Sequence, residues 1–142
     1  MKKKIFLIFI LLLNFISKKN LIFAQIPTTC FEIQSILVDA CGNPEGENEM
    51  VRFVTGPNSL NISNLIVTWP NNIYLNICQN AQTATNVDTL NAAIQSCGYI
   101  LEPSGGILPP GKTVILVTST NMNPFSNSFA NLSDTIYMIF QC

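Results

Sequence analysis

The chain has 142 residues, of which 48% are hydrophobic and 11% are charged, and it contains no histidine. The lack of histidine excludes Ser-His-Asp and Cys-His nucleophiles and imidazole-ligated zinc. From residue 25 onward the chain has two basic and eight acidic side chains, which gives a formal charge of −6. Nucleic acids and anionic lipid surfaces require clustered positive charge, so we expect neither as a partner.

The first segment predicts a secretory signal peptide over residues 1–24. Three lysines follow Met1, an apolar run covers residues 5–13, and Ala24 offers a small residue for cleavage. A transmembrane anchor is the alternative, but polar residues at 14 and 17–20 interrupt the run before it reaches the roughly 20 apolar residues that a spanning helix needs. We therefore expect a protein that is secreted or held at the outer cell surface, with a single domain over residues 25–142 and no membrane span.

The exported part consists of short apolar blocks separated by clusters of Asn, Gly, Pro and Ser, a pattern typical of strands joined by turns. Several blocks are continuously apolar, so we expect strands that are covered on both faces or packed sheet on sheet. The predicted strands are 31–38, 50–54, 65–69, 113–118 and 135–141, with weaker candidates at 73–77 and 99–101.

Only residues 86–98 have helical spacing. Their apolar positions at i, i+3, i+4 and i+7 predict a short helix that buries one face, formed by Leu90, Ala93, Ile94 and Cys97. Asn86 or Asp88 would cap its N-terminus, and Gly98 would supply the left-handed residue at its C-terminus.

Five cysteines in an exported chain predict disulfides: Cys30, Cys41, Cys78, Cys97 and Cys142. The first strand block separates Cys30 from Cys41 by roughly 36 Å, whereas a disulfide requires Cα atoms within about 7 Å. We favour Cys78 with Cys97, which would close the segment that holds the helix, and Cys41 with Cys97 stays open as an alternative. A zinc site is disfavoured because the cysteines show no Cys-x-x-Cys spacing.

The odd number of cysteines leaves at least one without a partner in the chain. Cys142 is the last residue and directly follows an apolar block. One interpretation is a reading frame truncated at its C-terminus, which has lost a partner cysteine and a final strand. The other is a dimer linked through a cysteine.

An acidic turn separates the first two strand blocks and holds four of the eight carboxylates: Asp39, Glu45, Glu47 and Glu49. Hard oxygen ligands in a glycine-containing loop can bind calcium, so these four residues are the candidate metal site. A solvated acidic turn is the alternative, because their spacing differs from that of known calcium loops. Acid–base catalysis of glycoside hydrolysis is disfavoured, since adjacent loop positions indicate no cleft, and we predict no catalytic residue and no other cofactor.

Five segments carry a resemblance to a known family. Residues 36–39 and 46–53 are similar to its first two strands, residues 63–69 to an "L-x-G-W" strand, residues 108–116 to an "L-x-P-G" turn and strand, and residues 129–137 to an "N-L-x-(G/D)-D" segment. In this order they resemble the lamin-tail domain as it is found in secreted proteins of Bacteroidetes. The chain departs from the family at the residue before Trp69, which is not glycine, and at residues 78–97, which look like an insertion.

The resemblance implies an all-β, immunoglobulin-like β-sandwich of about seven strands with one short helix in an insertion. It also implies a non-catalytic module for adhesion, tethering or protein interaction, whose partner is a protein or a glycan at the cell surface. The alternative function is a calcium-dependent or carbohydrate-binding domain of a larger extracellular protein. Sugar binding usually needs exposed aromatic side chains, and Trp69, inside a β-branched run, is better explained as a core residue.

Overall fold

The computed structural model describes residues 31–38, 40, 46–70 and 73–142. The predicted signal peptide, Cys30, Cys41, Asp39 and Glu45 lie outside these described residues. Within them the chain is mainly β, with eight strands and one α-helix, so the predicted predominance of strands is confirmed. In the same part of the chain, no helix combines the length and the apolar character needed to cross a bilayer.

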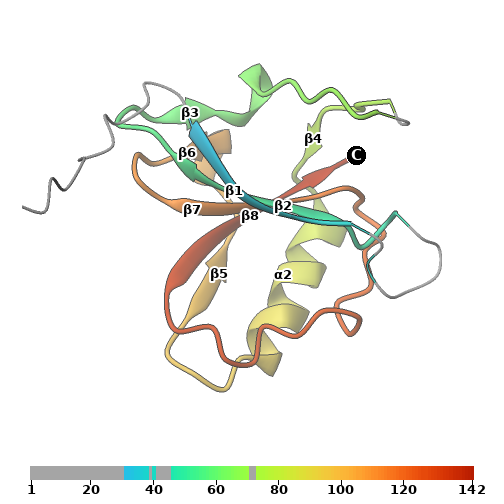
Figure 1. Cartoon of the computed structure of the whole chain (residues 1–142). Helices are drawn as coiled ribbons and strands as arrows, with labels where there is room; N and C mark the ends of the chain where they lie inside the picture. The colour runs from blue at the N-terminus through green and yellow to red at the C-terminus, as the bar shows by residue number, and fades with distance from the viewer. Residues whose placement is uncertain (1–30, 39, 41–45, 71–72) are drawn as a thin grey trace, which may run out of the picture.

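The strands form a six-stranded mixed sheet and a separate two-stranded ribbon (Figure 1). The sheet has the order β1-β2-β7-β8-β4, and β5 also pairs with β8. Its strands are β1 (Phe31–Leu37), β2 (Met50–Thr55), β4 (Ile77–Cys78), β5 (Tyr99–Leu101), β7 (Thr113–Val117) and β8 (Thr135–Gln141). The ribbon pairs β3 (Leu60–Asn61) with β6 (Ile107–Leu108), and the 3-10 turns η1 (Ile62–Asn64) and η2 (Ser104–Gly106) adjoin it.

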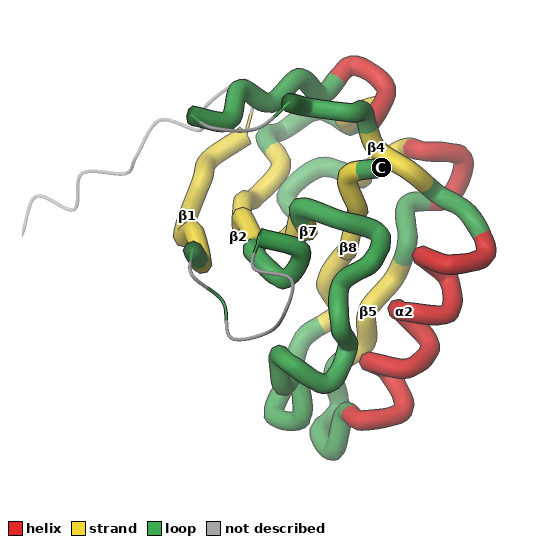
Figure 2. Tube along the Cα trace, turned by 90° about the vertical axis from the view of Figure 1, so that its right-hand side faces the viewer, coloured by secondary structure: helices red, strands yellow, loops and turns green. Residues whose placement is uncertain are grey.

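Strand β8 is the centre of the sheet. Strand β7 pairs with it in parallel on one side. On the other side β5 pairs in parallel with its first half, and β4 pairs antiparallel with its last residues. Figure 2 shows β1, β2, β7 and β8 side by side, with β5 and the helix at the end of the sheet opposite β1. The mainly-β class is thus established, and the immunoglobulin-like sandwich stays a prediction.

Both faces of the central strands are covered, as their continuous apolar runs predicted. Alternate side chains of β7 and β8 point to opposite faces. On one face they join a core cluster with Val87 and Leu90 of the helix α2 (Ala81–Ala93). On the other face they join a second cluster with Ile62, Leu65 and Leu108. Within the described part of the chain, no α-helix packs on the second cluster. The segment that follows η1 packs there instead.

The predicted helix is correct in kind but wrong in its bounds. It begins five residues earlier than expected, because Asn80 caps it: the Asn80 side chain accepts hydrogen bonds from the backbone N–H of Gln82 and Thr83, at 2.9 and 3.1 Å. The buried face is shifted back by seven residues, or two turns, and consists of Thr83, Asn86, Val87 and Leu90. Asn86 is therefore not a cap but a buried residue, whose Nδ2 donates to the Thr120 carbonyl at 2.9 Å.

The C-terminal half of the predicted helical face is also partly wrong, because the helix ends earlier than predicted. The helix ends at Ala93, before Cys97, and the side chains of Ala93 and Cys97 are exposed. Ile94, which directly follows the helix, is partly buried against the first core cluster, as its predicted place on the buried face implied. Gly98 does not end the helix either. Its backbone N–H donates to the Leu132 carbonyl at 2.9 Å, and a Cβ at this position would lie 2.3 Å from that oxygen. Glycine is required here by a close approach of two backbones.

The segment 65–69 is not the strand that its alternating pattern predicted. Leu65 is buried and Trp69 is half-buried, whereas Ile66 and Thr68 are exposed, so the alternation is present. However, the sheet pairings place no strand here. Alternation reports an extended backbone with one buried face, and it does not report hydrogen bonding to a neighbouring strand. The weaker block 73–77 contributes only Ile77 to β4, whereas 99–101 forms β5 as predicted.

The predicted pairing of Cys78 with Cys97 is wrong. Cys78 bonds to Cys142, with Cα atoms 5.0 Å apart. Strand β4 brings Cys78 beside the end of β8, where Cys78 is the ladder partner of Phe140. Cys97 is a free, exposed thiol that donates to the Ser133 carbonyl at 3.2 Å. Cys142 is thus not the unpaired cysteine that the odd count suggested.

Candidate functional site

The acidic turn is only partly described, and its two described acidic residues make different contacts. Glu47 accepts a hydrogen bond from Asn121 Nδ2 at 3.4 Å. The backbone carbonyl of Glu49 accepts from the Thr118 N–H and hydroxyl, at 3.1 and 3.2 Å. Among the described residues no group of three or more Cys, Asp or Glu side chains is placed to hold a metal ion. Calcium binding by Asp39, Glu45, Glu47 and Glu49 stays a prediction, because two of the four lie outside the described residues.

Buried polar contacts fix the C-terminal part of this turn. Asn48 is buried, and its Oδ1 accepts from the Asn123 N–H at 2.7 Å. The Thr118 hydroxyl also donates to the Gly46 carbonyl. These bonds join the turn to the loop that follows β7, so Met50 enters β2 at a fixed position beside Val117. The described part of the turn therefore serves to position β2.

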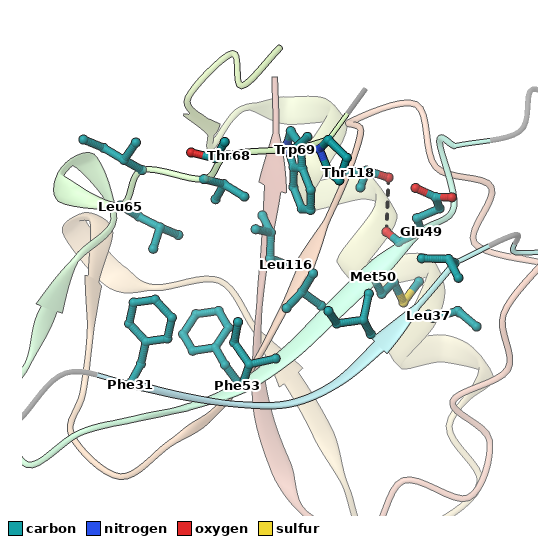
Figure 3. Close-up of a pocket in the computed structure, with 17 residues that line it drawn as sticks. Phe31, Leu37, Glu49, Met50, Phe53, Leu65, Thr68, Trp69, Leu116 and Thr118 are labelled. Atoms are coloured by element: carbon teal, nitrogen blue, oxygen red, sulfur yellow. Dashed lines mark hydrogen bonds between the residues drawn. The ribbon is translucent and has the colours of Figure 1, made fainter. Parts of the chain in front are cut away.

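An apolar groove lies on the sheet face that has no helix (Figure 3). One wall is formed by β1 and β2, the other by residues 65–70, and Leu116 of β7 contributes to its base. Its volume is about 760 Å³. Figure 3 shows Leu65 and Trp69 above Leu116, with Phe31 and Phe53 on the opposite side. Among the described residues that line the groove, Glu49 is the one with a charged side chain.

Two hydrogen bonds hold the wall formed by residues 65–70 in place. Trp69 Nε1 donates to Gln141 Oε1 at 2.6 Å, which ties the indole to the end of β8. The Tyr74 hydroxyl donates to the Leu65 carbonyl at 2.6 Å. Burial raises the pKa of the Tyr74 phenol above its ordinary value, because desolvation disfavours the phenolate. The segment is therefore anchored at both ends although it is not part of the sheet.

The opposite wall is anchored by an aromatic pair and shaped by a bulge. The rings of Phe31 and Phe53 have centroids 5.2 Å apart, within the range of favourable aromatic pairs. In β1 the register shifts between Ile33 and Ser35, so Gln34 is an extra residue of the kind that defines a β-bulge. After the shift Ile33 lies opposite Phe53 and Ile36 lies opposite Val51. Phe53 and Val51 belong to one core cluster, so the bulge keeps both isoleucines on the groove side.

Strand β1 leaves these apolar side chains open to solvent. Ile33 and Ile36 are 55% and 58% exposed, and Leu37 and Val38 are also exposed. Across the groove, Ile66 is 82% exposed. Contiguous exposed apolar surface on a folded domain marks an interaction site more often than scattered apolar residues do. The groove is therefore the candidate functional site.

The sequence carried only indirect signals of this site. It predicted β1, β2 and an extended segment at 65–69, which are the walls, but it placed the candidate site in the acidic turn. The exposure of β1 was not visible, because its pattern resembles that of a buried strand. Comparison with protein-family models, with curated proteins and with solved structures found no match. The resemblance to the lamin-tail domain therefore rests on its sequence motifs and stays a prediction.

Proposed function

We propose that the chain is a non-catalytic binding module that acts outside the cell and receives an apolar ligand in the groove between β1 and residues 65–70. The observation that carries the proposal is the groove itself, an apolar cavity of about 760 Å³. Ligand sites typically enclose about 300–1,000 Å³ and combine an apolar lining with a few polar groups. Thr68, Thr118 and Glu49 are such polar groups in its lining.

The disulfide between Cys78 and Cys142 supports the extracellular location, because disulfides persist in oxidising compartments. The signal-peptide pattern of residues 1–24 supports it independently. The order of motifs that resembles the lamin-tail domain, with its immunoglobulin-like sandwich, supports adhesion, tethering or protein interaction at the cell surface. In this proposal the apolar ligand belongs to a protein or to another molecule that is displayed at the cell surface.

The chain offers its own reporter for a test. Trp69 is its single tryptophan and lines the groove, so intrinsic fluorescence reports occupancy of this site. We would titrate the purified protein with Nile red, an uncharged dye that fluoresces in apolar surroundings, and follow the emission of both the dye and Trp69. Two isoleucines give a matched pair of variants: Ile66 lines the groove, whereas Ile73, 74% exposed, does not.

We expect Ile66→Ser to weaken dye binding about tenfold, because it removes an apolar side chain worth roughly 1.5 kcal/mol or more when buried. Ile73→Ser should leave binding unchanged, and both variants should melt at the wild-type temperature. Equal effects of the two variants, or binding without any change in Trp69 emission, would place the dye elsewhere and contradict the proposal.

A further inference from the structure

Strand β1 is an edge strand of the sheet that the described residues form, and its side chains line the groove. In the described part of the chain its one sheet neighbour is β2. An edge strand presents backbone N–H and C=O groups that can pair with another strand. Proteins usually protect such edges with lysine, proline, inward charges or bulges. Over its seven residues β1 has one charge, Glu32, and the bulge at Gln34, and no lysine or proline.

The geometry of an added strand matches the groove. A strand that paired with the outer edge of β1 would lie about 4.8 Å from it, and every second side chain would point to the face that carries Ile33 and Ile36. Those side chains would extend the apolar wall opposite residues 65–70. Main-chain pairing would then provide affinity and the groove would select the side chains, which is the physical basis of β-strand addition.

Charge decides between the two available sources of such a strand. From residue 25 onward each copy of this chain carries a formal charge of −6, so two copies repel each other. Among the described residues, the groove contributes Glu49 and β1 contributes Glu32. The one basic side chain beside β1 in this part of the chain is Arg52 of β2, opposite Ser35, so the described charges here are net acidic. A partner segment with an apolar centre and basic flanks is therefore complementary, whereas a second copy of β1 is not.

We propose that β1 and the groove together accept an extended, basic-flanked segment of a partner protein, which adds to the sheet beside β1 and places alternate apolar side chains in the groove. The inference rests on the proposed function and specifies its ligand class. It uses the edge of β1 that no described strand covers, the exposed isoleucines and the acidic charge. An acyl chain or another small apolar ligand would not require all three.

The probe is a synthetic peptide of about ten residues in which valine and threonine alternate and a lysine stands at each end. A second peptide carries proline in place of the central valine, because proline cannot donate to a ladder and is disfavoured inside a strand. A third carries glutamate in place of the lysines. Trp69 fluorescence measures binding, and hydrogen exchange measures protection of the β1 amides.

We expect the first peptide to bind and to slow hydrogen exchange of the β1 amides. Its affinity should fall as the salt concentration is raised. The proline and glutamate peptides should bind at least about tenfold more weakly. Ile36→Lys should reduce binding by a similar factor, since it adds a charge to the groove side of β1 and repels the flanking lysines. Ile73→Ser is the control, and equal melting temperatures confirm that both variants fold.

Each of the following results would overturn the inference. Binding of Nile red without binding of the peptide leaves the proposed function standing and removes the strand partner. Peptide binding without protection of β1, or equal binding of the proline peptide, shows that no strand is added. A dimer in solution with β1 protected shows that a second copy occupies the edge. Failure of both probes overturns the proposed function as well.

Discussion

Strands β1 and β8 each have seven residues and are similarly rich in apolar side chains, yet one is exposed and the other is buried. Strand β8 pairs with β7, β5 and β4 and has covering segments on both faces. Strand β1 pairs with β2 alone among the described residues. The difference shows that apolar composition does not by itself determine burial. An apolar strand at an open edge keeps its capacity to pair, and we assign that capacity to ligand binding.

The largest expected effect is in β8, at Phe140, which is fully buried. Phe140→Ala should lower the free energy of unfolding by about 4 kcal/mol, because it removes a large side chain and leaves a cavity. Phe125, 84% exposed, provides the matched control, and Phe125→Ala should change stability by less than about 0.5 kcal/mol. Urea denaturation measures both, and similar losses in the two variants would contradict the contrast between buried and exposed apolar residues.

The disulfide should rank next. Replacing both Cys78 and Cys142 with serine should cost up to about 4 kcal/mol, because the bridge closes a separation of 64 residues and restricts the unfolded chain. Cys97→Ser is the control, and it should leave the melting temperature unchanged because Cys97 is free and exposed. Mass mapping of the oxidised protein after proteolysis tests the pairing directly. A fragment that links Cys78 to Cys97 would refute it.

A smaller effect is expected at Gly98, where the chain enters β5. Gly98→Ala should cost about 2 kcal/mol, since the added Cβ would meet the Leu132 carbonyl and force the two backbones apart. Thermal unfolding measures the loss. Gly105→Ala, where a Cβ would meet no atom within 4 Å but φ is +58°, should cost about 1 kcal/mol through backbone strain alone. A larger loss at Gly105 than at Gly98 would show that the close approach is unimportant.

The smallest effect concerns the groove wall. Tyr74→Phe should cost about 1 kcal/mol, because it removes the hydrogen bond to the Leu65 carbonyl. Burial raises the folded-state pKa of Tyr74 above the unfolded value of 10.0, so its contribution is complete below pH 10.0 and is lost as pH rises through the folded pKa. Stability measured across this range should therefore fall more steeply in the wild type than in Tyr74→Phe. Parallel curves would contradict this assignment.

Local patterns accounted for most of the elements. The blocks at 31–38, 50–54, 113–118 and 135–141 coincide with β1, β2, β7 and β8 to within one residue at each end, because apolar runs bounded by turn residues are a local signal. The helix was displaced because Asn80 and Thr83 form a capping box outside the apolar pattern. Segment 65–69 was assigned to a strand because periodicity cannot detect a missing neighbour.

The candidate site was harder to predict than the elements. Carboxylates in the acidic turn were the visible chemistry, whereas the groove consists of ordinary apolar residues that gain significance from exposure. Ile36 and Ile139 are both isoleucines in strands, yet Ile36 is 58% exposed and Ile139 is fully buried. The sequence also could not select the partner of Cys78, because the antiparallel pairing of β4 with the end of β8 brings Cys142 close from 64 positions away.

The sequence by itself determined the strand-rich composition, the acidic charge and the lack of histidine chemistry, since these follow from residue types and short periodic patterns. Only the tertiary structure decided the strand order, the disulfide and the groove. Each of these depends on segments that are distant in the chain and meet only after folding. The open edge at β1 is the clearest case, because a strand becomes an edge through the position of its neighbours and not through its own residues.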